Sequence, residues 1–116
     1  MVGKWHLKSE PTGFDYWKVL SDQGDYYQPE FRTSDGLVTV QGYASDVITD
    51  YALDFLKEKG NDDKPFLLMY QHKAPHREWM PSQDYLDEFM DQPIPAPQSL
   101  FDDYKNAHQI PHGVQQ

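Results

Sequence analysis

The feature that most restricts the fold of this chain is a helical pattern of apolar side chains over residues 45–59. The apolar residues recur at the spacing of one helix face, namely Val47, Ile48, Tyr51, Ala52, Phe55 and Leu56. Ser45 is positioned to cap the first turn, and Gly60 suits the left-handed residue that commonly ends a helix. We therefore predict a helix over residues 45–59 that buries this face against another element.

A short apolar run, Phe66–Tyr70, follows this helix after a polar turn. Because Pro65 and Pro75 flank the run and polar residues do not interrupt it, we interpret it as a strand buried on both faces. Helix, turn and strand then form half of a right-handed crossover unit in an α/β sheet. Ligands bind beyond the carboxyl ends of parallel strands, so the loop over residues 71–79 is the first candidate for a functional site.

The other predicted elements are short and are joined by many turn-forming residues, so we expect a loop-rich fold. Residues 28–33 and 37–40 are expected to form a hairpin closed by an Asp-Gly turn. A second, shorter helix is predicted over residues 82–91, and one or two helical turns over residues 100–106.

The composition excludes several classes of protein. With 116 residues, 38% of them hydrophobic, the chain has the size of one small domain. A formal net charge of -9 argues against nucleic acid as a partner, because phosphate recognition depends on cations. The chain has no cysteine, which excludes disulfides, thiolate metal ligands and a cysteine nucleophile. No apolar stretch reaches the roughly 18 residues of a membrane span, and we find no signal segment in this chain.

Lys4 and His6 flank Trp5 near the start of the chain. In an extended backbone both side chains project to the same side, where a cation and an imidazole could bind an oxyanion. The alternative is an ordinary surface lysine beside a packed histidine. Spacing alone leaves both interpretations open.

His76 lies next to Arg77 and close to Lys73, directly after the predicted strand. A histidine there suits an anion ligand or a general acid, because its usual pKa permits proton transfer near neutral pH. The alternative is a loop histidine bonded to backbone carbonyl groups. His72 and His76 are four residues apart, but Pro75 disfavours the helix that would make them a metal pair, so we predict no metal ligands.

Four segments resemble the type I sulfatases, the formylglycine-dependent family of the alkaline-phosphatase-like superfamily. Gly3-Lys4-Trp5-His6-Leu7 resembles a signature of that family, and Tyr70-Gln71-His72-Lys73-Ala74-Pro75-His76-Arg77 resembles the loop that carries its sulfate-contacting histidine. Weaker matches lie at residues 13–17 and 42–50, so the resemblance covers about residues 1–104. It is strongest to bacterial glycan sulfatases that are similar to N-acetylglucosamine-6-sulfatases.

The resemblance implies roles for individual residues. Lys4 would bind a sulfate oxygen and help to hold the formylglycine nucleophile, and His6 would hydrogen-bond the hydroxyl of that nucleophile. His76 would contact the sulfate and protonate the leaving alcohol. Sugar-binding roles would fall to Lys73, Arg77 and Trp79.

The departures from the family pattern are also informative. Lys8 stands where the signature usually has glycine, and the chain has no Cys-x-Pro-Ser-Arg or Ser-x-Pro-Ser-Arg segment. We also match none of the family's calcium ligands. We therefore expect residues 1–116 to be a central, internal part of a sulfatase catalytic domain, a fragment of an alkaline-phosphatase-like sheet with flanking helices. Calcium and formylglycine are expected in the complete enzyme, with no ligands for them in this chain.

The expected partners are a sulfated carbohydrate substrate and the rest of the sulfatase domain, and self-association would also cover an exposed sheet edge. The resemblance implies a periplasmic or secreted location. We expect the isolated chain to be inactive. The alternatives are a non-catalytic module that binds sulfated or acidic glycans, a phosphoesterase of the same superfamily, and a truncated product with no activity of its own.

Overall fold

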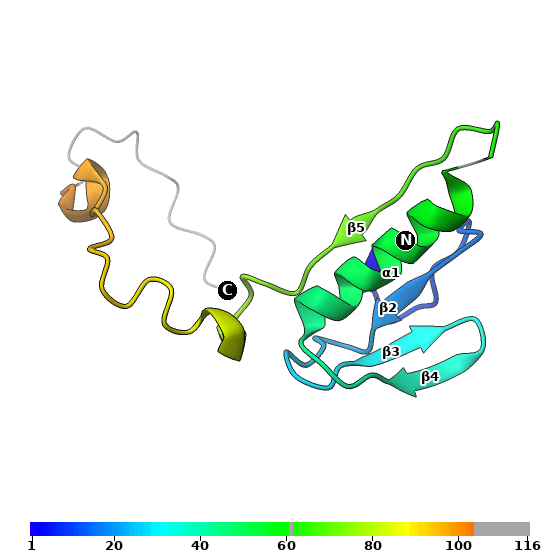
Figure 1. Ribbon diagram of the computed structural model, residues 1–116, viewed down its shortest axis with the longest axis horizontal. Coiled ribbons are helices and arrows are strands. Elements are labelled where there is room, and N and C mark those ends of the chain that lie inside the picture. Colours follow the sequence, from blue (N-terminus) through cyan, green and yellow to red (C-terminus); the bar gives the residue numbers. More distant parts are fainter. Residues whose placement is uncertain (61, 104–116) are drawn as a thin grey trace. The chain divides into compact units, whose positions relative to one another are not determined.

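The computed structural model describes residues 1–60 and 62–103, which form an α/β fold with a five-stranded sheet (Figure 1). The strands are β1 (Val2–Gly3), β2 (Lys18–Leu20), β3 (Glu30–Thr33), β4 (Gly36–Thr39) and β5 (Tyr70–Gln71). The helices are α1 (Ala44–Lys59) and the short 3-10 turns η1 (Gln83–Tyr85) and η2 (Gln98–Phe101). The predicted α/β fold class is confirmed.

Residues 1–86 form one compact unit, which contains every named strand together with α1 and η1. The residues from Asp87 onward belong to a second unit, in which η2 lies. None of the helices within residues 1–60 and 62–103 is long and apolar enough to cross a membrane.

The strand order in the sheet is β4-β3-β2-β1-β5. β1 runs parallel to both of its neighbours, so Val2 pairs with Lys18 of β2 on one side and with Tyr70 of β5 on the other. β3 is antiparallel to both of its neighbours, β2 and β4, and the predicted hairpin is confirmed as the β3–β4 pair. Because β2, β1 and β5 are parallel, their carboxyl ends meet at one edge of the sheet, where α/β proteins bind ligands.

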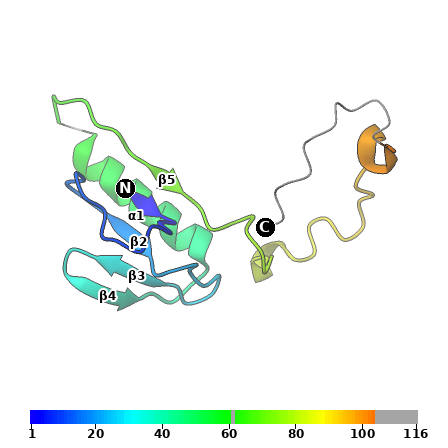
Figure 2. The same cartoon turned by 180° about the vertical axis from the view of Figure 1, so that it is seen from behind.

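α1 lies across one face of the sheet, and the view from behind shows the strands in front of it (Figures 1 and 2). The core joins this helix to the sheet through Val2, Leu20, Phe31, Val47, Ile48 and Ala52. The helix over residues 45–59 is therefore confirmed with its predicted buried face, except at Leu56, which is 40% exposed.

The predicted N-cap of α1 is wrong, whereas Gly60 does end the helix as predicted but without the predicted left-handed conformation. The N-cap is Tyr43 and not Ser45, and no side chain caps the helix, because the Ala44 N–H donates to the carbonyl of Tyr26 at 2.8 Å. Gly60 is right-handed, with φ of -63°, since its N–H still donates to the Leu56 carbonyl at 2.7 Å as in a helix.

The predicted strand over residues 66–70 is wrong in length and in burial. Only Tyr70 and Gln71 form β5, and this strand lies at the edge of the sheet with β1 as its partner. Leu67 is 81% exposed and Phe66 is 48% exposed. An apolar run indicates that side chains are suited to burial, but not whether the covering element belongs to the same chain.

The predicted helices near the end of the chain are also wrong in extent. Residues 82–91 contain only η1, where the Ser82 hydroxyl accepts a hydrogen bond from the Asp84 N–H at 3.4 Å. Phe89 and Met90 are 60% and 75% exposed, so the apolar face lacks the packing that stabilises a short helix. η2 begins before the predicted residues 100–106, of which 104–106 lie outside the described residues.

Candidate active site

Gly3 brings β1 and β5 together at the edge where the candidate residues lie. Its φ is +102°, and a Cβ atom at this position would lie 1.7 Å from the carbonyl oxygen of Gln71. The next residue, Lys4, continues the pairing, because its N–H donates to the same carbonyl at 2.8 Å. Only glycine permits this approach, which places the residues after β1 beside those after β5.

Gln23 connects three of the predicted site residues. The Lys4 ammonium donates to the Gln23 side-chain oxygen at 2.7 Å, and the Gln23 side-chain nitrogen lies 3.0 Å from Nε2 of His6. The Lys73 ammonium donates to the Gln23 backbone carbonyl at 3.2 Å, and that of Lys4 lies 3.4 Å from the same oxygen. The structure therefore brings Lys4, His6 and Lys73 together around one glutamine.

Sequence reasoning missed Gln23 because it lies among the turn-forming residues from which we expected only a loop-rich fold. The segment contains β2, which has only three residues and carries no clear alternation. Gln23 follows β2 by three residues, and the parallel pairing of β2 with β1 places it at the ligand-binding edge. Gln23 could have been identified only from the parallel pairing of β1 with β2, because a glutamine by itself does not indicate a functional site.

Within residues 1–60 and 62–103, the two lysines at this edge have no carboxylate partner. Lys73 is only 6% exposed, and its ammonium lies 4.7 Å above the ring of Tyr26. No ion pair within 4.0 Å involves Lys4 or Lys73 in the part of the chain that the structure describes. Burial lowers the pKa of Lys4, the charge of Lys73 lowers it further, and Asp22 partly opposes both effects. Such a pair of cations is suited to an anionic ligand.

His76 lies in the turn after β5, on the wall of a surface pocket of about 370 Å³. Gln23, Tyr26, Lys73 and Arg77 line the same pocket. The Nδ1 atom of His76 lies 2.5 Å from the Arg77 carbonyl, and because a carbonyl only accepts, Nδ1 carries the proton. The loop-histidine interpretation describes the Nδ1 atom, whereas Nε2 forms no hydrogen bond among the described residues, so the role as anion ligand or general acid stays a prediction.

Three tyrosine hydroxyls hold the chain that runs from His76 to Pro81. Tyr26 donates to the carbonyl of His76, Tyr43 to that of Met80 at 2.8 Å, and Tyr27 to that of Pro81 at 2.6 Å. The rings also contact one another, since Tyr43 lies 5.9 Å from Tyr26 and 5.4 Å from Tyr27 between centroids. This tyrosine cluster, Tyr26, Tyr27 and Tyr43, fixes the loop that carries His76.

The remaining predicted residues are placed differently. Arg77 lines the pocket with an exposed side chain, whereas Trp79 is 73% exposed and is not among the lining residues. The ring of His72 packs on Tyr70, with centroids 4.5 Å apart. Among residues 1–60 and 62–103, no group of three or more His, Asp or Glu side chains could hold a metal ion.

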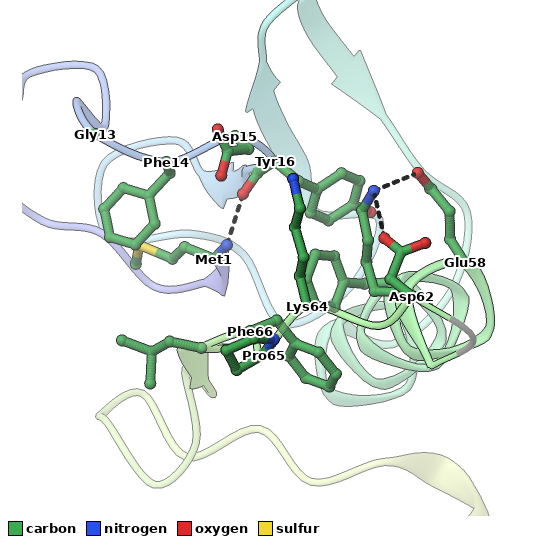
Figure 3. Close-up of a pocket in the computed structure, with 13 residues that line it drawn as sticks. Met1, Gly13, Phe14, Asp15, Tyr16, Glu58, Asp62, Lys64, Pro65 and Phe66 are labelled. Carbon is green, nitrogen blue, oxygen red and sulfur yellow. Dashed lines mark hydrogen bonds and ion pairs between the residues drawn. The ribbon is translucent and has the colours of Figure 1, made fainter.

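A second hollow, of about 510 Å³, lies at the other end of β1 (Figure 3). Its walls include Met1, Phe14, Phe55 and Phe66. Two dashed lines in Figure 3 join one ammonium group, that of Lys59, to the carboxylates of Glu58 and Asp62. These ion pairs distinguish the second hollow from the pocket beside His76.

A sulfatase family model matches residues 1–109, and the chain therefore belongs to the sulfatase family. It is 50% identical over 108 residues to an N-acetylglucosamine-6-O-sulfatase of Bacteroides thetaiotaomicron, a match that covers 90% of this chain and 19% of that relative. It is 34% identical to an ulvan-active sulfatase of Formosa agariphila, over 64% of this chain and 17% of the relative. It is 32% identical to the N-acetylglucosamine-6-sulfatase of Capra hircus, over 68% of this chain and 15% of that relative.

A solved structure is also similar to this chain in sequence and fold. It is described as a protein in complex with its substrate D-glucosamine-2-N,6-O-disulfate, and it matches with a TM-score of 0.78 and 51% identity. The match covers 90% of this chain and 22% of the other. The chain thus spans about a fifth of the length of the Bacteroides relative and of the protein in the solved structure, which agrees with the expectation that it corresponds to part of a sulfatase.

Proposed function

We propose that this chain is part of a sulfatase that hydrolyses sulfate esters of carbohydrates. In this proposal its residues hold the sulfate group and protonate the leaving alcohol. The observation that carries the proposal is the convergence of the Lys4 and Lys73 ammonium groups on Gln23, with no carboxylate within 4.0 Å of either in the described residues. Membership of the sulfatase family gives this cationic edge its chemical interpretation.

Lys4 and Lys73 are suited to the non-bridging oxygens of a sulfate ester, which carry its negative charge. Neutral oxygens of Gln23 hold both ammonium groups, so the positive charge is not cancelled within the protein. Charge-assisted hydrogen bonds to oxyanions are stronger than those between neutral groups, and fixed cations need no reorganisation during the reaction. Arg77 adds a third cation at the rim of the same pocket.

His76 is our candidate for the general acid. Its Nδ1 proton is engaged by the Arg77 carbonyl, so a protonated ring has one free donor, the Nε2–H. An alcohol is a poor leaving group as an alkoxide, and a donor placed on its oxygen lowers the barrier to its departure. His6, which contacts Gln23 and lies 3.2 Å from Asp22, is proposed to orient the nucleophile, as the family resemblance implies.

Sulfatases generally use a formylglycine and a metal ion. The described residues do not fit either group, because they contain no suitable cluster of metal ligands and the sequence has no Cys-x-Pro-Ser-Arg or Ser-x-Pro-Ser-Arg segment. We propose that other parts of the complete enzyme supply formylglycine and calcium, and we derive no step through them. Trp79, exposed in this structure, is kept as a proposed sugar contact.

The proposed substrate class is sulfated glucosamine. The names of the relatives refer to N-acetylglucosamine 6-sulfate chemistry, and the similar solved structure holds D-glucosamine-2-N,6-O-disulfate. We further propose that the rest of the sulfatase domain or a second copy covers the exposed edge strand, and that the complete protein is periplasmic or secreted.

The test compares the 116-residue chain with the complete polypeptide that contains it. We expect the complete polypeptide to hydrolyse an aryl sulfate and glucosamine 6-sulfate, and the chain alone to show no turnover. Comparable turnover by both would contradict the proposal that the nucleophile lies elsewhere. Faster hydrolysis of a phosphate ester would indicate a phosphoesterase, and salt-sensitive glycan binding without turnover would indicate a binding module.

A further inference from the structure

We infer that Gln23 is a positioning residue, which orients Lys4 and His6 and keeps the charge of Lys4 available for the substrate. The inference rests on the proposed sulfatase function and extends it to a residue that no family signature identified. Gln23 contacts Lys4 through its side-chain oxygen and His6 through its side-chain nitrogen. It is thus the direct link between these two candidate residues.

The turn after β2 holds Gln23 in place independently of these contacts. The Ser21 N–H pairs with the carbonyl of Glu30, and the Gly24 N–H closes the turn on the Ser21 carbonyl at 2.8 Å. Gly24 has a φ of +71°, and a Cβ atom there would lie 2.7 Å from Leu20. The backbone carbonyl and the side chain of Gln23 therefore reach the sheet edge from a closely packed turn.

An amide is the side chain that satisfies both neighbours without neutralising the lysine. Its oxygen accepts from the Lys4 ammonium, and its NH₂ group, which only donates, requires an unprotonated nitrogen on His6. A carboxylate here would form an ion pair with Lys4 and compete with a sulfate for it. An apolar side chain would leave Lys4 without its 2.7 Å contact.

Contacts at both ring nitrogens select one tautomer of His6. The Gln23 side-chain nitrogen lies 3.0 Å from Nε2 and 3.2 Å from Nδ1, and the Asp22 carboxylate lies 3.2 Å from Nε2. A proton on Nε2 satisfies both groups, because the carboxylate then accepts from Nε2 and the amide donates to Nδ1. The charged groups that face this ring are Asp22 and, across Gln23, Lys4. Loss of the amide should therefore increase the population with a proton on Nδ1.

The experiment compares Gln23→Leu and Gln23→Glu in the complete polypeptide, with Gln41→Leu as the matched control at an exposed glutamine. Both substitutions keep the backbone carbonyl that holds Lys73. We expect Gln23→Leu to lower kcat roughly tenfold, the scale of a hydrogen bond to a charged group. We expect Gln23→Glu to raise KM for glucosamine 6-sulfate by a similar factor, with a smaller change in kcat.

A second readout does not depend on turnover. In ¹⁵N-histidine-labelled protein, the nitrogen shifts of His6, assigned with His6→Asn, should show a proton on Nε2 in the parent and an increased Nδ1–H population in Gln23→Leu. Unchanged kcat, KM and His6 shifts in a folded Gln23→Leu variant would overturn the inference. If Gln23→Leu does not fold, the same measurements of kcat, KM and the His6 shifts are made on Gln23→Glu, and values unchanged from the parent would overturn the inference. A parent that hydrolyses no sulfate ester would instead overturn the proposed function, while the His6 shifts would still test Gln23.

Discussion

The hollow of Figure 3 and the pocket beside His76 lie toward opposite ends of β1, and both are lined by lysine. They differ in the groups that contact the lysine ammonium, which are carboxylates in the hollow of Figure 3 and a carbonyl oxygen in the pocket beside His76. In the hollow of Figure 3, Lys59 lies 3.4 Å from Asp62 and 3.5 Å from Glu58, and its pKa is raised, chiefly by the hydrogen bond to Asp62. In the pocket region beyond β1, Lys4 and Lys73 meet carbonyl oxygens, and burial lowers the pKa of Lys4. The hollow of Figure 3 pairs the Lys59 ammonium with carboxylates, whereas the pocket beside His76 leaves the positive charge of Lys73 for a ligand.

This difference shows why residue type alone does not identify a site. A lysine between two carboxylates on an exposed helix end contributes little beyond solvation and local order. A buried lysine held by neutral oxygens lacks the compensation that buried charges usually have, and an anionic ligand would supply it. The following predictions test whether the two hollows differ as described.

The largest effect is expected from Gly3→Ala, which should disrupt the sheet edge on which the pocket beside His76 depends. The new Cβ atom would lie 1.7 Å from the Gln71 carbonyl, so β1 and β5 would have to separate. We expect the free energy of unfolding to fall by more than about 3 kcal/mol, measured by urea denaturation.

Gly13→Ala is the matched control for this clash. Gly13 also has a positive φ, of +82°, but a Cβ atom there meets nothing within 4 Å. We expect only the conformational cost of about 1–2 kcal/mol. Equal losses in the two variants would contradict the role that we give to the close approach of β1 and β5.

Lys73→Met should abolish most anion binding, whereas Lys59→Met should not. Methionine fills a similar space over Tyr26 but carries no charge, so we expect the affinity for inorganic sulfate to fall at least tenfold, in line with a lost charge-assisted contact. Isothermal titration of both variants measures this. An equal loss of affinity in Lys59→Met would show that the two hollows do not differ in the way their charges suggest.

The part of this arrangement that could be predicted from the sequence is the part set by local pattern. The apolar period of residues 45–59 predicted α1, and the Asp-Gly turn predicted the β3–β4 hairpin. Lys4, His6 and His76 entered through resemblance to a family, because their spacing was compatible with ordinary surface residues.

The rest depends on contacts between distant parts of the chain. β2 has three residues, too few for a visible alternation, so the position of Gln23 at the sheet edge follows only from its pairing with β1. Leu67 is exposed and η1 is short because few side chains pack against them in the described residues. A local sequence pattern does not show which distant residues will pack against it.

Tyr26→Phe should produce an intermediate effect that is specific to the loop of His76. The ring beneath Lys73 remains, but the hydroxyl that donates to the His76 carbonyl is lost. In the complete polypeptide we expect turnover of substrates with poor leaving groups to fall several-fold, for a hydrogen bond worth about 1 kcal/mol. Tyr43→Phe, which loses a contact to Met80 instead, is the control, and the same loss of turnover in both variants would argue against a specific role for Tyr26.

The smallest effect is expected in the pH dependence of sulfate binding. The folded protein lowers the pKa of Lys4 below its usual 10.5, through burial and the charge of Lys73. Anion binding needs the ammonium form, so sulfate affinity should begin to fall at a pH below 10.5, and the bound anion should in turn raise the pKa of Lys4. Arginine stays protonated over this range, so Lys4→Arg should remove the decline that Lys4 causes. The measurement is the affinity for inorganic sulfate, determined by titration from pH 7 to pH 10. An identical decline of this affinity in the parent and in Lys4→Arg would assign the pH dependence to another group and would show that the charge of Lys4 takes no part in binding.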